Sequence, residues 1–244
     1  MFAEDEARLL VEAARTEAEL TAMVRRRVNG LPLEHILGWA SFRGLRIAVA
    51  PGVFVPRQRT AFLVEEAARR APRPAVVLDL CCGSGALGVA LAAELGDVEL
   101  FAADVDPAAV RCARVNVEPV GGHVFEGDLF APLPASLRGR VDVLLANVPY
   151  VPTSAIATMP PEARDHEPPV ALDGGRDGLA VLRRVAAGAP SWLAPGGRLL
   201  VEVSDEQAPA AVAAFESAGL VAEVARSPEL WATAVVGTVH APSG

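Results

Sequence analysis

The sequence contains no lysine: all 22 basic residues are arginine, and 30 acidic residues outnumber them. The resulting net charge of −8 disfavours stable binding to nucleic acid, which usually needs a basic surface. The apolar runs fall short of the roughly 18 residues that a membrane span requires. The acidic start, Met1 to Glu6, also differs from the basic and apolar start of a secretory signal. We therefore expect a cytoplasmic protein that does not bind membranes.

Cysteine is scarce, and its three positions are Cys81, Cys82 and Cys112. Two of them are adjacent, which fits neither a disulfide framework nor the spacing of a zinc site, so no metal is expected. With 244 residues, of which 52% are hydrophobic, the chain can fill a sizeable core. It has room for one α/β domain and a small amino-terminal attachment.

The first 74 residues predict that attachment and a connection to the main domain. Apolar residues at helical spacing from Glu4 to Val28 predict a short helical segment within residues 1–32, which Asn29-Gly30 ends. Alternation between Leu33 and Pro56, with a turn at Pro51-Gly52, predicts a linker hairpin or an extended linker. Residues 33–74 would end with a helix.

That last helix is expected over Ala61–Arg70, with Thr60 as its N-cap and Pro72 after its end. From residue 75 onward, strands and helices alternate. The expected strands are Val76–Leu80, Val98–Ala103, His123–Glu126, Val141–Ala146, Arg198–Val203, Val221–Ala225 and Thr233–Val239. The expected helices are Ala86–Leu95, Pro107–Asn116, Leu179–Ala189 and Gln207–Ala218. This order predicts an α/β fold with a doubly wound, mostly parallel seven-stranded sheet and one antiparallel strand.

The connection from Val151 to Gly178 is the one long irregular segment that the pattern predicts. It is rich in proline and glycine, and loops of this length in a compact domain tend to be functional or disordered. Its His166 is expected to have a structural role.

The glycine loop Asp79-Leu80-Cys81-Cys82-Gly83-Ser84-Gly85 lies between an expected strand and an expected helix. A glycine turn at this place lets a nucleotide-like ligand approach the backbone. The letters Gly83 to Gly88 also satisfy the pattern of dinucleotide binders. Asp104, at the end of the next strand, is suited to hydrogen-bond both hydroxyls of a ribose. Asp106 is expected to cap the helix that Pro107 begins.

Charge separates the candidate cofactors of this loop. The carboxylate of Asp79 would repel a pyrophosphate, whereas S-adenosylmethionine carries a sulfonium and an ammonium and no phosphate. The loop therefore favours S-adenosylmethionine over NAD. After the third strand, Asp128 could accept a hydrogen bond from an adenine amino group while Leu129 covers the ring.

A second motif, Asn147-Val148-Pro149-Tyr150, ends another apolar strand. It places a side-chain amide, a backbone carbonyl, a rigid proline and an aromatic ring at the edge where open α/β sheets bind ligands. Such groups can hold a planar, neutral N–H₂ group and accept its hydrogen bonds. The motif therefore predicts methylation of an amide or amino nitrogen.

From Leu33 to Gly237 the chain resembles the protein-(glutamine-N5) methyltransferases that modify peptide-chain release factors, within the class I S-adenosylmethionine-dependent enzymes. The resemblance implies that residues 75–244 form the methyltransferase domain. It rests on the loop Asp79 to Gly85, Asp104, Asn147 to Tyr150, Gly38…Phe42…Pro51…Val55-Pro56-Arg57…Thr60, and Glu167-Pro168…Ala171-Leu172-Asp173-Gly174-Gly175…Asp177-Gly178-Leu179.

The resemblance also implies a role for each motif. Asp104 would hold the ribose, Asp128 and Leu129 the adenine, and the loop Cys81 to Gly85 the methionine part. The Asn147 side chain and the Val148 carbonyl would accept hydrogen bonds from the target NH₂, and Tyr150 would pack against its plane. Asn147 would also be one of the cofactor-binding residues. The acceptor would be an exposed glutamine of a protein, namely a release factor or a related protein.

The chain departs from the family pattern in four places. Val148 stands where the family has its first proline, and Cys81 stands where the first loop glycine is usual. The stretch Pro56 to Thr60 lacks the acidic residue usual before the threonine. The region before Leu33 is shorter than the family's helical amino-terminal domain. We therefore expect a paralogue with a shortened amino-terminal domain.

Three other functions remain open. A nucleic-acid N-methyltransferase would use the same tetrapeptide on an exocyclic amine of adenine or guanine, but such enzymes usually add a basic recognition domain. A non-catalytic, cofactor-binding partner subunit would not need the intact Asn147 and Tyr150. A small-molecule methyltransferase is the third alternative.

Overall fold

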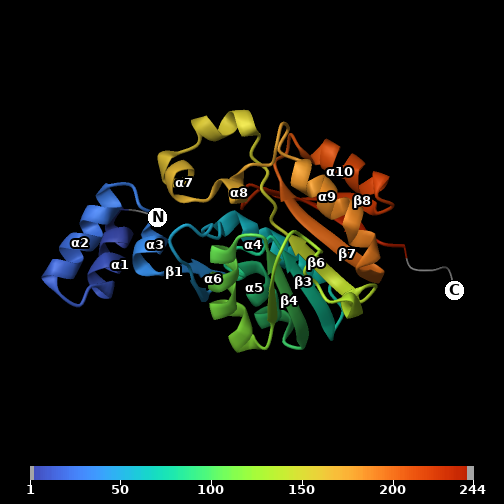
Figure 1. Cartoon of the computed structure of the whole chain (residues 1–244), viewed down its shortest axis with the longest axis horizontal. Helices are drawn as coiled ribbons and strands as arrows, with labels where there is room; N and C mark the ends of the chain where they lie inside the picture. The colour runs from blue at the N-terminus through green and yellow to red at the C-terminus, as the bar shows by residue number, and fades with distance from the viewer. Residues whose placement is uncertain (1–2, 241–244) are drawn as a thin grey trace.

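The computed structural model describes residues 3–240, which form a seven-stranded sheet with helices on both faces (Figure 1). The strand order is β5-β4-β3-β6-β7-β9-β8. Strand β9 alone runs in the opposite direction to the other six, so it is antiparallel to both β7 and β8. The strands are β3 Ala75–Leu80, β4 Val98–Asp104, β5 His123–Glu126, β6 Val141–Ala146, β7 Leu193–Val203, β8 Val221–Ser227 and β9 Ala232–Thr238. The predicted doubly wound sheet is confirmed, with β7 beginning five residues before the expected Arg198.

Two hydrophobic cores lie on the two faces of the sheet. One contains side chains of α4 Ala61–Arg70, α5 Ala86–Leu95 and α6 Pro107–Val117. The other contains side chains of α9 Ala180–Gly188 and α10 Ala208–Ser217. Because helices cover both faces, the central parallel strands are apolar runs without alternation. The expected cap of α6 is confirmed, since Asp106 accepts a hydrogen bond from Ala108 N at 2.8 Å.

The amino-terminal segment contains two helices rather than the single helix expected. These are α1 Ala3–Ala13 and α2 Glu17–Val28, and Thr16 caps the second by accepting from Glu19 N at 3.1 Å. The threonine followed three residues later by a glutamate is a helix-start signal that periodicity alone overlooks. A further short helix, α3 Leu33–Leu37, packs with them around a separate small core of Leu10, Met23, Leu33 and Ile36.

The linker is a hairpin, but its turn differs from the expected one. Strands β1 Trp39–Phe42 and β2 Leu45–Ala48 pair around Arg43-Gly44, whose φ angles are 48° and 76°. Two successive positive φ angles match the twist of a tight hairpin, so Pro51-Gly52 forms a separate turn beyond it. The expected cap at Thr60 is wrong: its φ of −67° is helical, and its buried hydroxyl has no partner in the described chain.

The segment expected to be irregular contains three short elements: η4 Thr153–Thr158, α7 Pro161–His166 and α8 Pro169–Leu172. Four further 3-10 turns lie elsewhere in residues 3–240: η1 Gln58–Thr60, η2 Glu118–Val120, η3 Ala135–Leu137 and η5 Ala189–Ser191. The segment expected to be irregular arches beyond the edge of the sheet (Figure 1). Arg27 of α2 reaches it through Glu162 at 3.2 Å. Within residues 3–240, no helix has the length and apolar character to cross a bilayer.

Candidate active site

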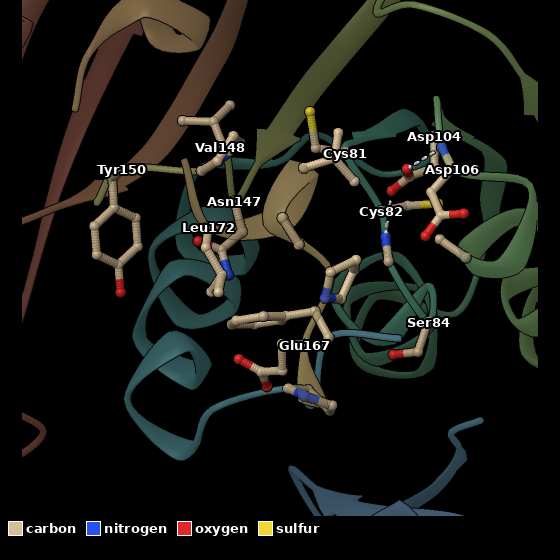
Figure 2. Close-up of a pocket in the computed structure, with 18 of the residues that line it drawn as sticks. Cys81, Cys82, Ser84, Asp104, Asp106, Asn147, Val148, Tyr150, Glu167 and Leu172 are labelled. Carbon is tan, nitrogen blue, oxygen red and sulfur yellow. Dashed lines mark hydrogen bonds between the residues drawn. The ribbon is translucent and has the colours of Figure 1, made fainter. Parts of the chain in front are cut away.

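A cavity of about 860 Å³ opens at the carboxyl edge of β3, β4 and β6 (Figure 2). Chain segments that follow these strands form its walls, because the carboxyl ends of parallel strands meet at one edge of the sheet. Eleven of the residues expected from the sequence line it: Cys81, Cys82, Gly83, Ser84, Asp104, Asp128, Leu129, Asn147, Val148, Pro149 and Tyr150. Two expected residues, Asp79 and Gly85, do not.

Asp104 is held at the cavity wall by backbone groups. Its Oδ2 accepts from Gly83 N at 2.8 Å, and its Oδ1 accepts from Asp106 N at 2.9 Å. Burial raises the pKa of this carboxyl, and the two backbone hydrogen bonds oppose that shift. A carboxylate oxygen has a second lone pair, so each oxygen can still accept from a ligand hydroxyl.

The glycine loop turns sharply beneath Asp104. Cys81 and Gly83 have φ angles of 54° and 55°, a region that favours glycine. Cys81 therefore carries a side chain where the backbone would favour none. Burial raises the pKa values of the Cys81 and Cys82 thiols, so both remain protonated. The geometry assigns these cysteines to the wall of the cavity rather than to nucleophilic chemistry.

Asp79 lies behind the loop and not in the cavity. Its side chain is buried, its Oδ2 accepts from Gly88 N at 2.9 Å, and burial raises its pKa to about 8. It therefore anchors the first turn of α5, and its contact with the cationic end of a cofactor stays a prediction. Gly85 also serves packing, because a Cβ there would come within 2.6 Å of Val117.

The corner expected to hold an adenine contains a residue that sequence spacing does not indicate. Arg184 of α9 donates to Asp128 Oδ2 at 2.5 Å, and both side chains line the cavity. Asp128 therefore has a charged partner before any ligand arrives. Leu129 beside it has a φ of 49°, which turns the chain at this corner.

The acceptor side of the cavity follows β6. Asn147, Val148 and Tyr150 lie together on one wall, opposite Cys82 and Asp104 (Figure 2). The Asn147 Oδ1 atom is buried and accepts no hydrogen bond within the described chain. An amide oxygen without a donor is costly in a protein interior.

Tyr150 is fixed by two residues that sequence reasoning missed. Arg59 donates to its hydroxyl and lies 5.6 Å from its ring centroid, and Gln207 Nε2 donates to its carbonyl at 2.9 Å. Arg59 also pairs with the buried Glu202 at 2.9 Å. These contacts join residues far apart in the chain, so no local spacing indicates them.

A partly buried ion pair closes the same side. Arg57 Nη2 donates to both oxygens of Glu167, at 2.6 and 2.7 Å, and Glu167 Oε1 also accepts from Val55 N at 3.2 Å. Burial raises the pKa of Glu167, and Arg57 opposes the shift. The linker and the segment after Tyr150 are thereby joined across the cavity. His166, next to Glu167, is not among the lining residues.

Comparisons with known proteins agree on the type of chain. The family model described as "Methyltransferase small domain" matches residues 44–160. The release factor glutamine methyltransferase of Geobacter sulfurreducens is 42% identical over 204 residues, 83% of this chain and 71% of the relative. The 4-amino-L-phenylalanine/4-methylamino-L-phenylalanine methyltransferase of Streptomyces pristinaespiralis is 37% identical over 203 residues, 80% of this chain and 69% of the relative. A solved methyltransferase from Pyrococcus furiosus has a TM-score of 0.62 at 16% identity, covering 90% of this chain and 99% of that chain.

The sheet order and the cavity at its carboxyl edge define a class I S-adenosylmethionine-dependent methyltransferase. Within that class, the chain belongs to the release factor glutamine methyltransferase family. The donor set fits S-adenosylmethionine, since Asp104 offers carboxylate oxygens for a ribose and the loop Asp79 to Gly85 has no basic side chain for a phosphate.

Proposed function

We propose that this enzyme transfers a methyl group from S-adenosylmethionine to the side-chain amide nitrogen of a glutamine in a protein, namely a peptide-chain release factor. The relatives of about 40% identity that are named release factor glutamine methyltransferase support this choice of acceptor. A cytoplasmic location follows from the proposal, because translation terminates there. The site residues support the chemistry.

The single observation that carries the proposal is the Asn147 amide in the cavity wall. Its oxygen has no donor within the described chain, and once the carboxamide turns this oxygen to the cavity it can accept from a glutamine carboxamide, which offers two N–H groups. Together with the Val148 carbonyl, it can fix the nitrogen of a planar, neutral group. The ring of Tyr150 can pack against that plane.

S-adenosylmethionine supplies a methyl group on a cationic sulfur. The residues of this chain would hold the amide nitrogen in line with that methyl, and such alignment supplies much of the rate. No histidine is among the residues that line the cavity. The proton lost from the nitrogen after transfer would therefore not pass to a histidine base.

The test uses a purified release factor with its Gly-Gly-Gln loop and a cofactor carrying a labelled methyl group. Mass spectrometry should find one methyl group on that glutamine and none after Gln→Glu in the release factor. The Asn147→Ala enzyme should give no product. Label on RNA alone would instead support the nucleic-acid alternative.

The relative from Streptomyces pristinaespiralis supports a second candidate, because its name gives an aromatic amine as the acceptor. Its arylamine and the glutamine amide both present a planar nitrogen. Incubation with 4-amino-L-phenylalanine in place of the release factor separates the two. Turnover of the amino acid without label on the protein would favour this candidate.

A further inference from the structure

Two buried oxygen atoms on the acceptor side of the cavity lack a hydrogen-bond donor within residues 3–240. Asn147 Oδ1 and Glu202 Oε2 are both buried, and neither has a hydrogen-bond donor within the described chain. Strand pairing matches Leu145 with Leu200 and Ala146 with Val201, where β6 ends. Continued by one residue, this register places Asn147 beside Glu202. Paired residues of neighbouring strands lie on the same face, and the strands are about 4.8 Å apart. The two unpaired acceptors are therefore neighbours.

We propose that Glu202 is a positioning residue that orients both Asn147 and Tyr150 for the acceptor. Rotation of the Asn147 carboxamide by 180° about its Cβ–Cγ bond exchanges oxygen and nitrogen without changing its shape. Nδ2 then donates to Glu202 Oε2, and Oδ1 turns toward the cavity. One rotation satisfies the carboxylate and presents the acceptor atom that the target N–H₂ needs.

The second oxygen of Glu202 acts on Tyr150 through Arg59. Glu202 Oε1 pairs with Arg59 Nε at 2.9 Å, and another nitrogen of the same guanidinium donates to the Tyr150 hydroxyl. The Glu202 side chain is 6% exposed, so its carboxylate is shielded and has few alternative partners. The buried carboxylate of Glu202 thus fixes both the Asn147 carboxamide, which binds the target nitrogen, and the Tyr150 ring, which covers it.

The contacts of Glu202 explain how the chain uses an arginine at a position where the family pattern has an acidic residue. Arg59 stands where the resemblance leads us to expect an acidic residue before Thr60. An acidic residue there could not pair with Glu202, because like charges repel. In this chain the arginine neutralises Glu202 and holds Tyr150. The inference deepens the proposed function and rests on it for the identity of the bound N–H₂ group.

Nuclear magnetic resonance tests the Asn147 contact without any acceptor. The sequence has three asparagines, Asn29, Asn116 and Asn147, so ¹⁵N-asparagine labelling gives three side-chain NH₂ signals. We expect one Asn147 proton to be shifted downfield and slow to exchange, as expected of a charge-assisted hydrogen bond. Glu202→Gln should move this signal and leave those of Asn29 and Asn116 in place.

Turnover tests the effect on the reaction. We expect Glu202→Gln to lower kcat by about 30- to 100-fold, since a small misplacement of a reacting group has an effect of that size. The Kd for S-adenosylmethionine should stay within about twofold, because Asp104 is untouched. Arg59→Gln should show a smaller loss that disappears in a Tyr150→Phe background, since both act through one hydroxyl.

The matched control is Glu66→Gln. Glu66 is also a buried glutamate, 2% exposed, and it pairs with Arg69 and Arg70 of α4 away from the cavity. Its replacement should leave kcat unchanged. If both variants lower kcat equally, loss of a buried ion pair explains the effect and the positioning role is rejected.

The wild-type spectrum decides the case even if Glu202→Gln does not fold. An Asn147 signal with ordinary shift and fast exchange overturns the inference. Failure of the proposed function looks different, because the Asn147 signal would be shifted as expected while no release factor gains a methyl group. The two failures are therefore distinguishable.

Discussion

The cofactor half and the acceptor half of the cavity are held in place by different kinds of contact. In the cofactor half, Asp104 is fixed by the backbone N–H groups of Gly83 and Asp106. In the acceptor half, Tyr150 depends on the side chains of Arg59 and Gln207. The first set lies on consecutive strand-to-helix turns. The second set comes from the linker and from beyond β7.

The two kinds of contact tolerate substitution differently. Backbone donors remain when side chains are substituted, so the cofactor half can accept unusual residues such as Cys81. Side-chain contacts are lost with a single substitution, so the acceptor half can change its target through a few residues such as Arg59. We expect cofactor binding and acceptor choice to respond independently to substitution. The predictions below test that independence.

The largest expected effect is that of Asn147→Ala. The variant removes the amide that would bind the target nitrogen, and we expect kcat to fall about 10²- to 10³-fold, the usual result of losing one preorganised polar group. Calorimetry should show an almost unchanged Kd for S-adenosylmethionine. The exposed Asn29→Ala is the control and should have full activity. Normal turnover by Asn147→Ala would falsify the assignment of the acceptor half.

Asp104→Ala should give the opposite pattern. It removes charge-assisted hydrogen bonds to a ribose, so binding of S-adenosylmethionine should weaken by about 1.5–3 kcal/mol. The rate at saturating cofactor should change much less. Asp104→Asn keeps one acceptor oxygen, so its affinity for S-adenosylmethionine should lie between those of the wild type and Asp104→Ala. Calorimetry measures both variants, and tight binding of NAD by the wild type would contradict the chosen cofactor.

The sequence predicts the cofactor half better than the acceptor half for a physical reason. Gly83, Asp104 and Asp106 meet because parallel strands bring successive turns to one edge, and that follows from the order of strands and helices. Arg184 beside Asp128 is the exception in this half. It comes from a distant helix whose rotation about its axis depends on core packing.

The acceptor half required tertiary contacts that no local pattern contains. Asn147 and Tyr150 are apparent in the sequence because they are contiguous. Arg59 is apparent only as a departure, and its pairing with Glu202 depends on the register of β6 with β7 and on the position of the turn before α4. The position of Asp79 outside the cavity is not apparent from the sequence for a related reason, since the sequence does not show which face of β3 holds its side chain.

Asp79→Asn tests the role of Asp79 and should have a smaller effect on function. Because Asp79 anchors Gly88 N and does not line the cavity, we expect the Kd for S-adenosylmethionine to change by less than about threefold, within the range of a residue that makes no direct ligand contact. A tenfold loss would show that Asp79 interacts with the cationic cofactor end after all.

The same variant has a pH signature. The folded-state pKa of about 8 lies above the unfolded value, about 3.9, so between these pH values the folded protein keeps a proton that the unfolded chain has released. Stability of the wild type therefore falls as pH rises through this window. Asp79→Asn lacks the ionisation, so its Tm relative to wild type should increase from pH 5 to pH 8. A constant difference would contradict the raised pKa.

The smallest expected effect is that of Val148→Pro, which restores the residue of the family pattern. The Val148 N–H donates no hydrogen bond among the described loops and turns, so its loss has little cost. Its carbonyl, the proposed acceptor atom, is retained, and a fixed φ reduces the freedom of the unfolded chain. We expect the free energy of unfolding to change by less than about 1 kcal/mol and activity toward glutamine to be kept or raised. Val148→Ala is the control, because it shortens this buried side chain without fixing φ. A large loss with proline but not with alanine would show that the turn has a φ that proline cannot adopt, and that the acceptor half has been rebuilt for another target.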